Sequence, residues 1–173
     1  VFSHAFDAAT CNPRLVFKSA EKRSGKTSAL ILIDKAAAQT VLTSNISPAM
    51  IFRVIERDKP TLLIDEADTF ATRSSEITGI LNSGHKREAA YVYRATGDDH
   101  EPTRFSTWAP VALAAIKDLP DTLEDRSIVI PMRRQTKIEG KARKRLRGSR
   151  PTGLEPLARK AARWANDHTD ELK

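Results

Sequence analysis

At residues 19–27 the sequence reads Ser19-Ala20-Glu21-Lys22-Arg23-Ser24-Gly25-Lys26-Thr27. An apolar run at 15–17 precedes this stretch, and Ser28 with the apolar residues 29–33 follows it. The order predicts a strand, a loop and a helix, with Gly25-Lys26-Thr27 where the loop meets the helix. In that context the pattern is typical of a phosphate-binding loop. The alternative is an ordinary helix start that binds no nucleotide.

The chemistry of such a loop follows from its backbone. Successive N–H groups and the N-terminus of the following helix form a cradle for an anion. We expect the nucleotide, ATP, to contact Ala20, Glu21, Lys22, Arg23, Ser24, Gly25, Lys26, Thr27 and Ser28. Lys26 then reaches the outer phosphates, and the Thr27 hydroxyl ligates Mg²⁺. Ala20 departs from the usual glycine, and alanine permits fewer backbone conformations.

A second stretch ends in two carboxylates, and it reads Pro60-Thr61-Leu62-Leu63-Ile64-Asp65-Glu66-Ala67-Asp68. Continuous apolar runs of this kind are typical of parallel sheets covered on both faces. In enzymes with a phosphate loop an aspartate after such a strand holds the metal ion. We therefore assign Asp65 to Mg²⁺ and the adjacent Glu66 to the activation of water. The alternative is a solvated acidic turn.

Length and composition fit one domain with a sizeable core, because the chain has 173 residues and is 40% hydrophobic. There is no apolar run long enough for a membrane span. Cys11 is the single cysteine, which leaves no disulfide framework and favours a reducing cytoplasm. The chain begins with Val1 and without signal-peptide features, so we expect a cytoplasmic piece of a longer protein.

The net charge of +7 is concentrated in residues 133–150, which hold nine Lys/Arg and one Glu. A basic block of this kind is either a nucleic-acid contact or a solvated linker. The candidate contacts are Arg143, Lys144, Arg145 and Arg147.

Strand patterns alternate with helix patterns along residues 14–132, which predicts a mostly parallel sheet with helices on both faces. We expect strands at 14–19, 40–43, 60–65, 111–116 and 127–132. Helices are expected at 26–39, 47–59, 74–84 and 119–126, and a hairpin at 91–108. Ligands in such folds bind at the carboxyl ends of strands, where residues 19–27 and Asp65-Glu66 both lie.

Six stretches, taken in order, resemble a known family, and they are residues 19–27, 45–49, 60–70, 80–85, 97–102 and 119–130. The family is the uncharacterised group of P-loop ATPase domains in phage, plasmid and actinobacterial primase–helicases. The resemblance covers residues 3–134 and returns weakly near Trp164-Ala165. Loops of that family commonly read Ser-Pro-Glu-Lys-Arg before Gly-Lys-Thr, so the lack of glycine at Ala20 is a family trait.

More distantly, the chain is similar to the additional-strand P-loop ATPases, which include AAA+ proteins and superfamily-three helicases. This resemblance implies a three-layer α/β fold with a sheet of about five strands, and often a homo-oligomeric ring. In such rings an arginine reaches into the neighbouring subunit's site, where it stabilises the transferring phosphoryl group. The matching position is Arg126, and the alternative is an ion pair with Asp125 or Glu124.

Other polar residues are weaker candidates for the site. The resemblance implies a polar sensor residue at the end of 111–116, where only Lys117 and Asp118 are available, so we assign none. Asn82, His85 and Arg94 could line the cleft, with a structural role as the alternative for each.

The leading interpretation is a Mg²⁺-dependent ATPase that acts on nucleic acid, with DNA expected, as the helicase part of a mobile-element replication protein. Lys26, Glu66 and Arg126 are its expected catalytic residues. The domain boundaries we expect are an ATPase core at 1–134, a basic linker at 135–153 and an amphipathic helix at 154–173 that begins a lid or helical domain. Alternatives are a nucleotide-binding module without its own catalysis and a P-loop kinase for a small molecule. Glu66 disfavours the kinase, because a glutamate beside Asp65 suits water activation.

Overall fold

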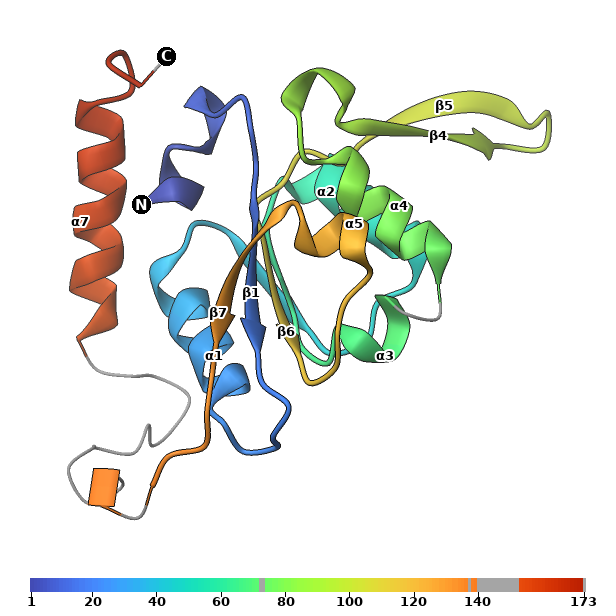
Figure 1. Ribbon diagram of the computed structural model, residues 1–173. Coiled ribbons are helices and arrows are strands. Elements are labelled where there is room, and N and C mark those ends of the chain that lie inside the picture. The colour runs from blue at the N-terminus through green and yellow to red at the C-terminus, as the bar shows by residue number, and fades with distance from the viewer. Residues whose placement is uncertain (72–73, 137, 140–152, 173) are drawn as a thin grey trace.

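The computed structural model describes residues 1–71, 74–136, 138–139 and 153–172 (Figure 1). Two short 3₁₀ turns, η1 (Phe2–His4) and η2 (Phe6–Ala8), begin the chain. Five strands then form one sheet in the order β2 (Thr40–Thr43), β3 (Thr61–Ile64), β6 (Val111–Ala115), β1 (Arg14–Lys18) and β7 (Ser127–Pro131). Every pairing in this sheet is parallel, so the expected α/β fold with a mostly parallel sheet is confirmed.

The apolar runs of the sequence form the centre of the sheet. Every residue of β3 and β6 is buried, as expected for parallel strands covered on both faces. β1 lies between β6 and β7, with Val16 opposite Leu113 on one side and Val129 on the other. Because β1, β6 and β3 are parallel, the loops after β1 and β3 lie at the same edge of the sheet. Only β6 separates the two strands, so these loops are close together.

Helices cover both faces of the sheet and give three layers (Figure 1). On one face α1 (Lys26–Ala36) buries Leu30 against Phe17 and Leu63. On the other face α2 (Pro48–Asp58) and α4 (Ser75–Ser83) contribute to the larger apolar cluster. Three short elements complete the layers, namely α3 (Asp68–Ala71), η3 (Arg87–Ala89) and α5 (Asp121–Glu124).

Most boundaries agree with the sequence-based expectation to within two residues, and the end of α1 is an exception. α1 ends at Ala36, three residues before the expected end at 39, because the backbone at Ala37 is already extended. The hairpin expected at 91–108 is confirmed; it consists of β4 (Tyr91–Thr96) and β5 (Glu101–Ser106) and ends two residues earlier than expected. It extends away from the sheet, as Figure 1 shows.

The C-terminal helix α7 (Leu154–Asp167) lies along α1 and η1 (Figure 1). Ala165 is its buried residue, whereas Trp164 is 43% exposed at the edge of a hollow shared with Val1 and Phe2. The amphipathic helix expected at 154–173 is therefore present, but it ends six residues earlier, at Asp167, and it packs against α1 and η1. Across the described residues, the helices lack the length and apolar character that crossing a membrane would require.

Candidate functional site

Residues 19–25 form a loop between β1 and α1, and together with the first two residues of α1, Lys26 and Thr27, they are here called the 19–27 loop. The Ser19 N–H donates to the Ala115 carbonyl of the adjacent strand at 3.2 Å, which fixes the start of the loop. Gly25 precedes α1 with φ +89°, a left-handed conformation that glycine adopts without steric cost. Ala20 does not have a positive φ, so the missing glycine at this position causes no strain.

Lys26 is 8% exposed, and its side chain folds back into the 19–27 loop. Its ammonium donates to the Ser24 hydroxyl at 3.0 Å and to the Glu21 carbonyl at 3.1 Å, with the Ser19 carbonyl at 3.5 Å. An ammonium has three donors, so these loop oxygens can satisfy all of them. The positive charge is therefore held within the loop, next to the N-terminus of α1, where an anion would gain most from it.

Thr27 and Asp65 are in direct contact, although 38 residues separate them in the chain. The Thr27 hydroxyl donates to Asp65 Oδ2 at 2.7 Å, and Asp65 Oδ1 accepts from the Glu66 N–H at 2.9 Å. The Asp65 N–H donates to the Thr43 carbonyl at 2.8 Å, which extends the pairing of β2 with β3 by one residue. The sheet thus brings together the two residues predicted to ligate Mg²⁺.

This oxygen pair suits a hard cation that keeps part of its water shell. Mg²⁺ is usually bound by one or two protein oxygens together with phosphate oxygens and water. The residues present fit that pattern, since a hydroxyl and a carboxylate lie beside the 19–27 loop. Within the described part of the chain, no group of three or more His, Cys, Asp or Glu side chains could hold a metal ion by itself.

Glu66 is exposed and borders the same cleft as the 19–27 loop. Its φ is +53°, an uncommon conformation that costs a non-glycine residue about 1–2 kcal/mol. The Thr69 N–H and hydroxyl both donate to the Glu66 carbonyl, at 2.9 and 2.8 Å, and hold the turn in place. Such strain in a well-held turn is common at functional sites.

The cleft has a volume of about 1260 Å³. Residues 22–28 of the predicted contact set line it, together with Asp65 and Glu66. Ala20 and Glu21 do not line it, although Glu21 supplies a carbonyl to Lys26. The side chains of Ile116 and Met132 form an apolar part of the cleft wall.

Arg133, Gln135 and Glu139, which follow β7, also border the cleft. The sequence identifies this segment as basic, but it does not predict that the segment lies at the site. Arg133 donates to Glu139 through both terminal guanidinium nitrogens, from Nη2 to Oε1 at 2.5 Å and from Nη1 to Oε2 at 3.1 Å. Thr136 and Glu139 form a reciprocal capping pair, the Ser/Thr-x-x-Glu pattern that could have revealed this turn. Arg133 and then the Thr136 donors lower the pKa of Glu139 to about 2, so this carboxylate stays ionised at neutral pH.

Arg126 follows α5 and does not line the cleft of its own chain. Its guanidinium donates to the Thr122 carbonyl at 2.6 Å. Among the described residues, no ion pair joins Arg126 to Asp125 or Glu124, and Glu124 binds Lys18 instead at 2.6 Å. The ion pair considered as an alternative for Arg126 is therefore not found.

The weaker candidates have structural partners outside the cleft. Asn82 donates to the Thr122 hydroxyl at 3.0 Å, and Arg94 binds Glu76 at 2.9 Å. His85 Nδ1 lies 3.2 Å from the carbonyl oxygen of residue 12. Four further predicted residues lie outside the described part of the chain, and they are Arg143, Lys144, Arg145 and Arg147.

Searches against protein-family models and curated protein sequences find no match to this chain. Among solved structures, an X-ray structure of the JC virus (JCV) helicase is similar over 80% of this chain and 39% of the helicase chain, at 14% identity and a TM-score of 0.47. An inhibitor-bound JCV helicase is similar over 76% and 38%, at 14% identity and a TM-score of 0.45. The chain thus spans about two fifths of the helicase chains. A likeness this distant supports no functional conclusion.

Proposed function

We propose that this chain binds ATP with Mg²⁺ in the cleft beside the 19–27 loop and hydrolyses it. The observation that carries the proposal is the contact of the Thr27 hydroxyl with Asp65 at 2.7 Å, at the edge of a loop that encloses the Lys26 ammonium. The anion cradle suits the phosphate groups of ATP, and the adjacent pair of hard oxygen ligands suits the Mg²⁺ ion that accompanies them.

Each residue then has a distinct task. The backbone of the 19–27 loop and the N-terminus of α1 hold phosphate oxygens, and Lys26 turns its ammonium from the loop carbonyls to the outer phosphates. Thr27 and Asp65 would hold Mg²⁺, which when bound supplies positive charge against the phosphate oxygens. Glu66, exposed at the cleft, is free to accept a hydrogen bond from a water molecule and orient it for attack.

The proposed setting is a motor acting on nucleic acid, with DNA as the expected partner. Two features support it. The +8 balance of residues 133–150 would attract phosphates of the nucleic-acid backbone. Arg126 lies off its own cleft, and no carboxylate partner is found for it among the described residues, which suits an arginine offered to a neighbouring copy in a ring.

The experiment compares ATP affinity and phosphate release in the wild type, Lys26→Ala and Lys35→Ala. Lys35 is the matched control, because it lies on the same helix and pairs with Asp34 at 2.5 Å, away from the cleft. We expect Lys26→Ala to lose ATP binding and hydrolysis while Lys35→Ala keeps both. Equal affinity in a folded Lys26→Ala protein would refute the site. Binding without phosphate release in the wild type would instead support a nucleotide-binding module that lacks its own catalysis.

A further inference from the structure

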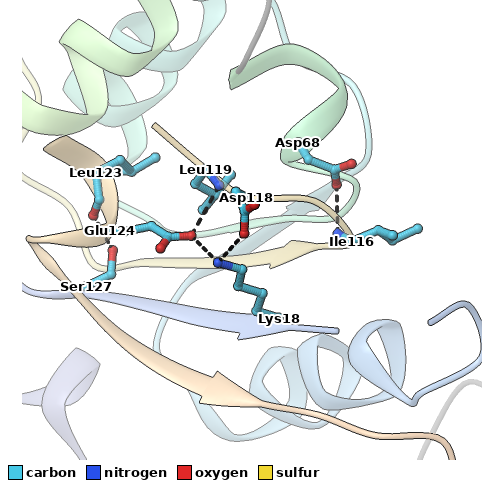
Figure 2. A network of polar contacts seen from close by, with 8 residues as sticks. All are labelled: Lys18, Asp68, Ile116, Asp118, Leu119, Leu123, Glu124 and Ser127. Carbon is cyan, nitrogen blue, oxygen red and sulfur yellow. Dashed lines mark hydrogen bonds and ion pairs between the residues drawn. The ribbon is translucent and has the colours of Figure 1, made fainter. Parts of the chain in front are cut away.

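A single ammonium, that of Lys18, joins three segments of the chain (Figure 2). Lys18 is the last residue of β1, directly before the 19–27 loop. Its Nζ lies 2.7 Å from Asp118 Oδ1 and 2.6 Å from Glu124 Oε1. Asp118 follows β6 and Glu124 ends α5, so Lys18 links the sheet strand before the loop to both of these elements.

The segment 116–119 is held from both ends, as Figure 2 shows. On one side the Ile116 N–H donates to Asp68 Oδ1 at 3.0 Å, which ties it to the turn that carries Glu66. On the other side the Leu119 N–H donates to Glu124 Oε1 at 3.2 Å, the oxygen that also binds Lys18. Because Ile116 lines the cleft, these contacts hold part of the cleft wall in position.

The two carboxylates around Lys18 differ in exposure. The side chains of Lys18 and Glu124 are 26% and 28% exposed, whereas that of Asp118 is 90% exposed. Solvent weakens ion pairs, so the Glu124 contact should matter more than the Asp118 contact. Both carboxylates, Asp118 first, raise the pKa of Lys18, which keeps the ammonium charged at neutral pH.

We infer that Lys18 is a positioning residue for the reaction proposed above: it fixes segment 116–119 and α5, and through them the Ile116 wall and Arg126, without touching the nucleotide. This inference rests on the proposed function. Lys18, Asp118 and Glu124 do not line the cleft, so they act only through the residues they hold. Their loss should therefore slow hydrolysis and leave nucleotide affinity nearly unchanged.

The test compares kcat, KM and the affinity for a fluorescent ATP analogue in folded variants. We expect Lys18→Met to lower kcat about 10- to 100-fold, the size of effect that small misplacements near a reaction produce, with affinity within about twofold of the wild type. Glu124→Gln should lower kcat more than Asp118→Asn, and Lys18→Arg should restore most of it. The double variant Lys18→Met/Glu124→Gln should be no slower than the slower single variant, because both remove the same contact.

A matched control and a readout independent of hydrolysis complete the design. Lys35→Met removes an ion pair of similar exposure (the Lys35 side chain is 32% exposed) outside the network, and its kcat should match the wild type. Amide hydrogen exchange at Leu119 should be faster in Lys18→Met than in Lys35→Met. Three results would each overturn the inference: a kcat of Lys18→Met equal to that of the wild type, a loss of nucleotide affinity in Lys18→Met as large as its loss of kcat, or the same amide exchange rate at Leu119 in Lys18→Met and Lys35→Met. A wild type that neither binds nor hydrolyses ATP refutes the proposed function, and this inference with it.

Discussion

Three glycines should respond to alanine in three different ways, because the structure surrounds each one differently. At Gly25, φ is +89° and an added Cβ would lie 3.6 Å from the Met132 side chain, an ordinary contact. The cost there is the left-handed backbone alone, about 1–2 kcal/mol. Gly79 is a solvent-exposed residue in the middle of α4, and nothing lies within 4 Å of the added Cβ. Alanine should stabilise that helix by about 0.5–1 kcal/mol.

Gly84 meets its neighbours directly. An added Cβ would lie 2.2 Å from the Thr107 carbonyl oxygen and 2.7 Å from a guanidinium nitrogen of Arg14. Arg14 cannot move away easily, because it is 1% exposed and donates to the carbonyls of Leu81 and Asn12. The backbone must therefore shift, at a cost at or above the upper end of the roughly 1–3 kcal/mol that overpacking produces.

Urea unfolding of the wild type and the three alanine variants measures these effects. The urea concentration at the unfolding midpoint should be highest in Gly79→Ala, followed by the wild type and Gly25→Ala, and lowest in Gly84→Ala. Gly25→Ala should also weaken ATP binding, because residue 25 lies in the proposed phosphate cradle, whereas Gly79→Ala should not. If Gly25→Ala proved as stable as the wild type, the left-handed entry to α1 would be wrong, and so would the shape of the cleft built on it.

The remaining predictions concern the proposed chemistry and its partners. Glu66→Gln should keep ATP binding and lower the hydrolysis rate about 10²–10⁴-fold, as for other groups that activate water, and normal hydrolysis would mean that another residue activates the water. Hydrolysis should rise faster than linearly with protein concentration, and a mixture of Lys26→Ala with Arg126→Ala should regain activity, since one partner supplies the loop and the other the arginine. No rescue in the mixture would remove Arg126 from catalysis. The affinity for single-stranded DNA should fall steeply as the salt concentration rises. This salt dependence should become weaker when four basic residues are neutralised, namely Arg143, Lys144, Arg145 and Arg147. An unchanged salt dependence would leave the basic segment as a solvated linker.

Local patterns in the sequence predicted most of the fold. The apolar runs in β3 and β6 predict buried parallel strands, because parallel strands covered by helices are buried on both faces and read as continuous apolar runs. The Gly25-Lys26-Thr27 pattern predicts where the loop enters α1. A serine at 74 or 75 is a typical helix cap, and in the structure it is the Ser74 hydroxyl that accepts from the Ile77 N–H at the start of α4. The end of α1 was placed too late because Ala37 and Ala38 favour helix, while the chain must already turn there to begin β2.

Contacts between distant segments could not be predicted in this way. Lys18 and Glu124 are 106 residues apart, and only the order of β6, β1 and β7 in the sheet brings them together. Glu124 was therefore considered as a partner for its near neighbour Arg126. The capping pair of Thr136 and Glu139 is visible in the sequence, but its position at the cleft depends on β7 lying beside β1.

Isothermal titration of ATP with Mg²⁺ or with EDTA, in the wild type and in Asp65→Asn, tests the central claim most directly. Asparagine keeps the size of the side chain and an oxygen that can accept from Thr27, so the fold should be unchanged, but the charge that would hold Mg²⁺ is lost. We predict that Mg²⁺ strengthens ATP binding in the wild type and that this gain largely disappears in Asp65→Asn. The same gain in both proteins, or no gain in the wild type, would contradict a Mg²⁺–ATP site built from Thr27 and Asp65.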